Sequence, residues 1–117
     1  MFKSICVYGM PLAQTYIMVL VIIHMKVSSK KRKELSQTIT SLLSSIRAEK
    51  GCGRCNFFHG MENENILCLL EEWDTRDNFE AHRRSEYFMV LRGAMNLLES
   101  PCKISLYDEY TSRIGQK

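Results

Sequence analysis

Residues 69–88 read Leu-Leu-Glu-Glu-Trp-Asp-Thr-Arg-Asp-Asn-Phe-Glu-Ala-His-Arg-Arg-Ser-Glu-Tyr-Phe, and this stretch decides the fold. Its start is typical of a β-strand that ends at Trp73, the single tryptophan of the chain. Asp74 or Thr75 then supplies a helix cap, and a helix that carries His82 follows. The stretch therefore predicts a strand-to-helix corner where aromatic side chains gather and where a pocket for a flat molecule can form.

The size and composition of the chain indicate one ordinary globular domain. It has 117 residues and a mass of 13.6 kDa, which suits one domain with a core of its own. Apolar residues make up 45% and charged residues 25%, so disordered and fibrous classes are excluded. Because a domain of this size gains stability from self-association, we expect a homo-oligomer.

The net charge of +3 is mild but unevenly spread, with a basic run at residues 30–33. Proteins that read nucleic acids usually offer a broad basic surface or a reading motif, and the sequence has neither. We interpret the basic run as a solvated helix start and expect no nucleic-acid partner.

The cysteines favour a reducing cytoplasm. Their number is odd, they are scattered, and no convincing secretory signal precedes them. They are Cys6, Cys52, Cys55, Cys68 and Cys102. The C-x-x-C at Cys52 and Cys55 follows a helix instead of opening one and has no second copy, so structural thiols are favoured over redox or zinc chemistry. The apolar run 17–23 is too short to cross a bilayer, and no membrane partner is expected.

Periodicity predicts a domain over residues 16–110, with a loosely ordered extension over 1–15 and a frayed tail over 111–117. The predicted elements are strands over 16–27, 52–60, 66–73 and 102–110, a helix from the cap at Ser28 to Gly51, and a helix after Asp74 or Thr75 that breaks near Ser85 and stops at Pro101.

This order of elements predicts an α+β fold, a ferredoxin-like antiparallel sheet with helices on one face. The uncovered face is apolar and should not stay in contact with water. Its predicted apolar residues are Leu20, Ile22, Ile66, Cys68 and Leu70. We therefore expect a homodimer that packs through this open sheet face and forms a dimeric α+β barrel.

The run 71–88, preceded by Glu-Lys-Gly-Cys at 49–52, resembles the antibiotic biosynthesis monooxygenase domain. The likeness rests on a strand that ends Glu-x-Trp and a helix with Phe-x-x-His-x-x-Ser-x-x-Phe, and it covers roughly residues 18–110. This family includes quinol monooxygenases and is related to haem-degrading monooxygenases. The resemblance implies a dimer that needs no metal or flavin cofactor, because the deprotonated substrate itself activates dioxygen.

Oxidation of an electron-rich aromatic ring needs a dry cavity, an aromatic wall and a base of near-neutral pKa. The candidate substrate-binding residues are Trp73, Phe79, Tyr87, Phe88 and Glu71. His82 is the first candidate for the catalytic base and His24 the second, since imidazole titrates in the useful range.

Each candidate also has a structural interpretation. Trp73 suits corner packing, His82 suits a hydrogen bond to a carboxylate such as Glu71, and His24 suits a dimer seam.

The leading hypothesis is a cofactor-independent monooxygenase that oxidises a quinol-like or polyphenolic aromatic substrate with dioxygen. One alternative is a haem-degrading relative, although the first strand carries His24 and lacks the Asn of those enzymes. The other is a non-enzymatic dimeric protein that holds a small apolar ligand or serves a stress response.

Overall fold

The computed structural model describes the backbone of residues 14–114 and the side chains of residues 18–108. Most of the predicted N-terminal extension and the end of the predicted tail therefore lie outside the described residues. β1 begins at Gln14 and β4 ends at Ile114, so both strands run past the predicted domain limits at residues 16 and 110.

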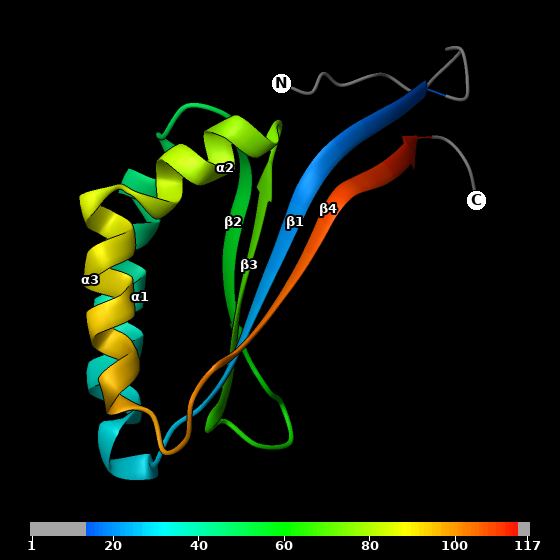
Figure 1. Cartoon of the computed structure of the whole chain (residues 1–117). Coiled ribbons are helices and arrows are strands. Elements are labelled where there is room, and N and C mark those ends of the chain that lie inside the picture. Colours follow the sequence, from blue (N-terminus) through cyan, green and yellow to red (C-terminus); the bar gives the residue numbers. More distant parts are fainter. Residues whose placement is uncertain (1–13, 115–117) are drawn as a thin grey trace.

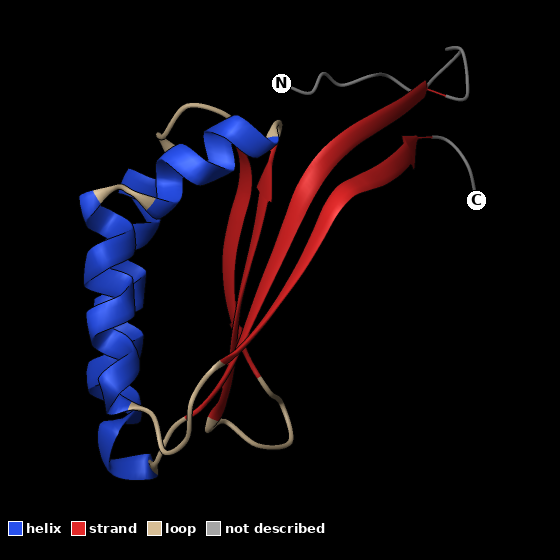
Figure 2. Ribbon diagram, viewed as in Figure 1, coloured by secondary structure: helices blue, strands red, loops and turns tan. Residues whose placement is uncertain are grey.

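One antiparallel sheet and three helices build the described part of the chain. In chain order they are β1 (Gln14–Lys26), α1 (Ser29–Arg47), β2 (Cys52–His59), β3 (Ile66–Trp73), α2 (Arg76–Arg83), α3 (Glu86–Ala94), a short 3-10 turn η1 (Met95–Leu97) and β4 (Lys103–Ile114). The strand order is β2-β3-β1-β4, and the helices all lie on one face of the sheet (Figure 1, Figure 2). The predicted ferredoxin-like α+β fold is confirmed.

Hydroxyl caps set the corner after β3 and the break between the last two helices. Thr75 Oγ1 accepts a hydrogen bond from the Asn78 backbone N–H at 3.1 Å and starts α2. Ser85 Oγ accepts one from the Phe88 backbone N–H at 3.2 Å and starts α3. The predicted break near Ser85 is therefore confirmed, and its cause is a second capping residue within one helical stretch.

Strand alternation separates the two faces of the sheet. The residues of β1 that face the helices are buried; the described ones are Val19, Val21, Ile23 and Met25. They pack against the apolar stripe of α1, which is Leu35, Ile39, Leu42 and Ile46. On the opposite side, which we call the open face, Leu20 and Ile22 are half-buried and His24 is exposed.

Strands β1 and β4 continue beyond the other two. The pairing of β1 with β3 starts at Val19, opposite Trp73, whereas its pairing with β4 starts at Gln14. The first residues of β1 thus form a two-stranded arm with the end of β4 (Figure 1). No helix in the described part of the chain is long and apolar enough to cross a membrane.

Candidate functional site

A buried cluster of polar and aromatic side chains joins the end of β3 to α2. Glu71, Trp73 and His82 are each 1% exposed or less. Trp73 Nε1 donates a hydrogen bond to Glu71 Oε1 at 2.9 Å. The rings of Trp73 and His82 are stacked, with centroids 4.5 Å apart and an interplanar angle of 25°. The corner predicted from residues 69–88 is thus a dry, close-packed site.

Glu49 completes this cluster from the turn after α1. Its Oε1 lies 2.8 Å from His82 Nδ1, and the two residues are 33 positions apart in the chain. The turn needs a glycine, because Gly51 has a φ of 87° and a Cβ there would lie 2.6 Å from Asn78 Cβ. Periodicity gave no sign of Glu49, since a turn residue belongs to no repeating pattern; its signal was its place in the Glu-Lys-Gly-Cys run at 49–52 that supports the family resemblance.

Two carboxylates determine the charge of His82. Burial by itself lowers the pKa of this imidazole, but the adjacent carboxylates of Glu71, and then of Glu49, outweigh burial and raise it. Nε2 lies 3.3 Å from Glu71 Oε1 without the geometry of a hydrogen bond, so that contact is electrostatic, whereas the contact with Glu49 is a hydrogen bond. His82 accordingly lies buried between two acids that favour its protonated form.

An apolar pocket of about 260 Å³ lies between α3 and the strands β1 and β4. It is lined by Ile23, Phe88, Leu91, Arg92, Met95, Cys102 and Ile104. Phe88 connects the pocket to the buried cluster, because its ring meets the His82 ring edge-on at 5.3 Å. Arg92 is the one charged residue of this lining. A single arginine on a helix carries no sequence signal of its own, and the sequence prediction missed it.

The structure brings Glu71, Trp73, His82 and Phe88 together, and of these only Phe88 lines the pocket. Tyr87 is half-buried and packs against the core.

Phe79 is 6% exposed and packs in the core at the start of the same helical stretch. The guanidinium carbons of Arg76 and Arg83 each lie 5.9 Å from its ring centroid, so Phe79 supports two surface arginines.

His24 does not join this site. It lies on the open face, opposite Cys68 of β3 and Lys103 of β4, because strand alternation turns it away from Ile23 and Met25. The two histidines proposed as bases therefore occupy opposite faces of the sheet.

A bulge in β2 between Cys52 and Arg54 turns both C-x-x-C thiols toward the helices. Cys52 pairs with Trp73 and Cys55 with Glu71. Burial, followed by the charge of Glu71, raises the pKa of Cys52 to about 11 and of Cys55 to about 12. Both thiols stay protonated at neutral pH, which makes them poor nucleophiles and fits the structural interpretation.

Comparison with known proteins agrees with this architecture. A conserved protein from Methanosarcina mazei is 25% identical with a TM-score of 0.75, covering 80% of this chain and 94% of that one. A protein from Nitrosomonas europaea, provisionally described as an antibiotic biosynthesis monooxygenase, is 18% identical with a TM-score of 0.73, covering 78% and 88%. A protein of unknown function from Bacteroides thetaiotaomicron, described as a possible oxidoreductase, is 16% identical with a TM-score of 0.68, covering 84% and 98%. No curated protein matches the sequence.

The sequence profile of the antibiotic biosynthesis monooxygenase family matches residues 18–92, which is well over half of the chain. This region includes most of β1, the β2–β3 hairpin and the whole buried cluster around His82. The chain therefore belongs to the antibiotic biosynthesis monooxygenase family.

Proposed function

We propose that this protein is a monooxygenase that oxidises a quinol-like or polyphenolic aromatic substrate with dioxygen and uses no metal or flavin. Family membership supports the reaction class. The observation that carries the substrate class is the apolar pocket of about 260 Å³, which has an aromatic wall at Phe88 and a single cation at Arg92. A flat, electron-rich ring suits the wall, and a phenolate oxygen suits the cation.

The reaction begins when the substrate loses a phenolic proton to the solvent and is bound as the phenolate. Arg92 favours the resulting anion, because a nearby positive charge lowers the pKa of a phenol. The apolar lining keeps water away from the activated ring. In the proposed reaction the substrate supplies all the electrons that reduce dioxygen. One oxygen atom enters the ring, the other leaves as water, and the quinol becomes a hydroxyquinone.

His82 has a positioning role in this proposal. A base must be neutral before it accepts a proton, and the two carboxylates beside His82 favour the imidazolium. The ring is also 1% exposed and is not part of the pocket lining. Its contacts with Trp73 and Phe88 instead fix the aromatic wall, so we assign His82 to holding Phe88 in place.

We further propose that the protein is a cytoplasmic homodimer that packs through its open face. Phe58 and Tyr107 on this face are 49% and 51% exposed, and Leu20, Ile22 and Leu70 are half-buried beside them. A second copy would remove this apolar surface from water. The four cysteines within the described residues are free thiols, which supports a reducing compartment.

Oxygen uptake tests the proposed function. The protein would be given a panel of reduced quinols in an oxygen electrode, and we expect uptake above the rate without protein. Arg92→Gln should lower kcat/KM about 10- to 100-fold through loss of the charge that stabilises the phenolate. Arg84→Gln is the matched control, since Arg84 is an exposed arginine outside the pocket lining.

Two further measurements separate the alternatives. His82→Gln should lower uptake and leave the pKa values of the kcat/KM profile unchanged, whereas loss of the acidic limb of that profile would make His82 the base. A haem titration followed in the Soret region tests the haem-degrading alternative. Quinol binding without oxygen uptake would show a binding protein and refute the proposed monooxygenase.

A further inference from the structure

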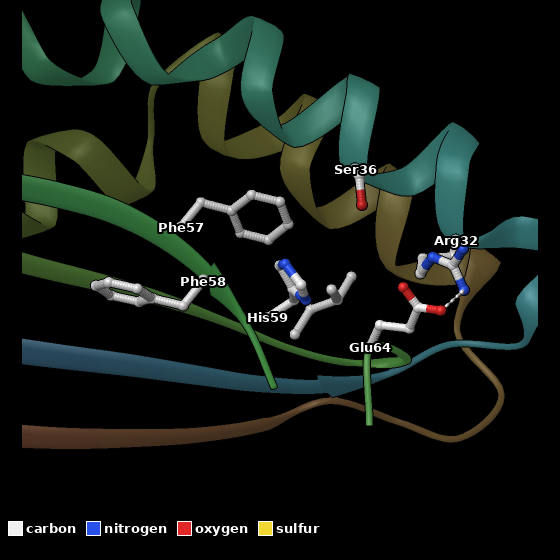
Figure 3. Close-up of a pocket in the computed structure, with 7 residues that line it drawn as sticks. Arg32, Ser36, Phe57, Phe58, His59 and Glu64 are labelled. Carbon is white, nitrogen blue, oxygen red and sulfur yellow. Dashed lines mark ion pairs between the residues drawn. The ribbon is translucent and has the colours of Figure 1, made fainter. Parts of the chain in front are cut away.

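A second pocket, of about 280 Å³, lies at the other end of the sheet from His82, between α1 and the end of β2 (Figure 3). It is lined by Arg32, Ser36, Phe57, Phe58, His59, Glu64 and Leu67. None of these residues belongs to the buried cluster or to the pocket beside Arg92, so the two pockets are separate.

The pocket has an aromatic side and a polar side. Phe57 and His59 pair with Leu69 and Leu67 of β3, which are buried under the helices, so both rings face α1. Leu67 is 1% exposed and provides an apolar floor. From α1, Arg32 and Ser36 face the pocket (Figure 3). A ligand here would meet rings on one side and hydrogen-bond donors on the other.

Arg32 is held in place by one guanidinium nitrogen, which leaves other N–H donors for a ligand. Its Nη1 donates to Asn65 Oδ1 at 2.9 Å and lies 3.7 Å from Glu64 Oε2. Within the described part of the chain, Nη1 is the one guanidinium nitrogen of Arg32 that makes a polar contact. A guanidinium carries five N–H donors, so Nε and Nη2 can bind an anion side-on.

The surroundings of Arg32 favour an anion over a neutral group. Residues 30–33 put four basic side chains near the start of α1, whose first turn contains no acidic residue. The N-cap Ser28 makes no side-chain hydrogen bond to this turn, and the helix dipole adds positive potential there. Glu64, whose side chain is 65% exposed, is the acidic residue in contact with Arg32, and such an exposed pair is weak.

We propose that this pocket binds a small, single-ring aromatic carboxylate. The ring would lie against Phe57, His59 and Leu67, and the carboxylate would bind Nε and Nη2 of Arg32 beside Glu64, with the Ser36 hydroxyl as a further donor. The pocket is just below the usual ligand-pocket range of about 300–1,000 Å³, which suits a small ligand with a single ring. This proposal is independent of the proposed oxygenation, which uses the pocket beside Arg92.

Titration of the whole chain with benzoate, followed by backbone amide NMR shifts, tests the proposal. We expect saturable shifts at Phe57 and His59. Benzyl alcohol has the same ring without the charge and should bind about tenfold more weakly, as should benzoate to Arg32→Gln, because each loses a charge-assisted contact. Equal binding of benzoate and benzyl alcohol, or unchanged affinity in Arg32→Gln, would overturn the proposal.

Glu64→Gln distinguishes a ligand site from a structural ion pair. Removing the competing carboxylate should tighten benzoate binding about two- to threefold, in line with the small energy of an exposed pair. A structural role for the pair predicts no gain in affinity. Arg54→Gln is the control, because Arg54 is an exposed arginine paired with Glu72 on the open face. Arg92→Gln should also leave benzoate affinity unchanged, and a loss there would place the ligand in the other pocket and refute this site.

Discussion

His82 and His24 face opposite sides of the same sheet, and their surroundings differ in every respect that sets the state of an imidazole. His82 is 1% exposed, stacks on Trp73 and has a carboxylate near each ring nitrogen. His24 is exposed and lies opposite Lys103 in the sheet. The buried site under the helices thus favours a protonated imidazole, whereas the open face of a single copy leaves its histidine exposed to water.

The difference shows that the helices determine which charges the sheet can bury. A charged group taken out of water needs a close counter-charge, and α2 and the turn after α1 bring His82 and Glu49 to Glu71. The open face has no such cover in one copy, and half-buried Ile22 and Cys68 lie near His24 there. The chain's own helices cover one face of the sheet, whereas a second copy would be needed to cover the other.

The largest expected effect is a difference in how much the two histidines contribute to the free energy of unfolding. His82→Leu should lower the free energy of unfolding by about 3–5 kcal/mol, because Glu49 and Glu71 lose the cation between them. His24→Leu, the matched change on the open face, should stay within about 0.5 kcal/mol of the native protein. Urea denaturation measures both. Equal losses in the two variants would show that His82 is not held by buried charge.

The next effect concerns the open face alone. Tyr107→Lys should weaken the proposed dimer by about 2 kcal/mol or more, since a buried tyrosine is a frequent hot spot and a lysine there would be desolvated. Sedimentation equilibrium measures the dissociation constant. Met61→Lys is the control, because Met61 is 96% exposed on the β2–β3 hairpin. A native protein that stays monomeric at every concentration would contradict the proposed dimer.

The smallest expected effect is a pH dependence of stability that comes from His82, on the face of the sheet under the helices. Because the pKa of His82 is raised on folding, its stabilising effect is fully present below the unfolded-state value of about 6.5 and is lost as pH rises through the folded-state value. Stability should fall over that window by up to about 1.4 kcal/mol per pH unit. Urea midpoints at a series of pH values measure this slope. It should persist in His24→Leu and disappear in His82→Leu; persistence in both would assign the titration to another group.

Much of this site could be predicted from residues close together in the chain. Trp73 ends a strand and His82 follows on the next helix, so their meeting at one corner follows from the spacing and from the cap at Thr75. The Glu71 contact was foreseen as the structural alternative for His82. Glu49 and Arg92 were not found, because one lies in a turn and the other is a lone charge on a helix.

Cys52 and Cys55 show a different limit of prediction from the sequence. Regular alternation would place Cys52 and Cys55 on opposite faces of β2, since they are three positions apart. The bulge between Cys52 and Arg54 shifts the register by one residue and brings both cysteines to the face under the helices. A bulge depends on how the neighbouring strand pairs, which the local pattern does not encode.

Short-range patterns were sufficient for the order of the elements, their caps and the side of each strand that is apolar, because alternation in strands and the helical period act over a few residues. The tertiary structure decided the direction of the His82 pKa shift, the two pockets and the separation of the two histidines. Each depends on side chains that are distant in sequence, such as Glu49 and His82, 33 positions apart. Burial and electrostatics act through space, so those properties exist only once the chain has folded.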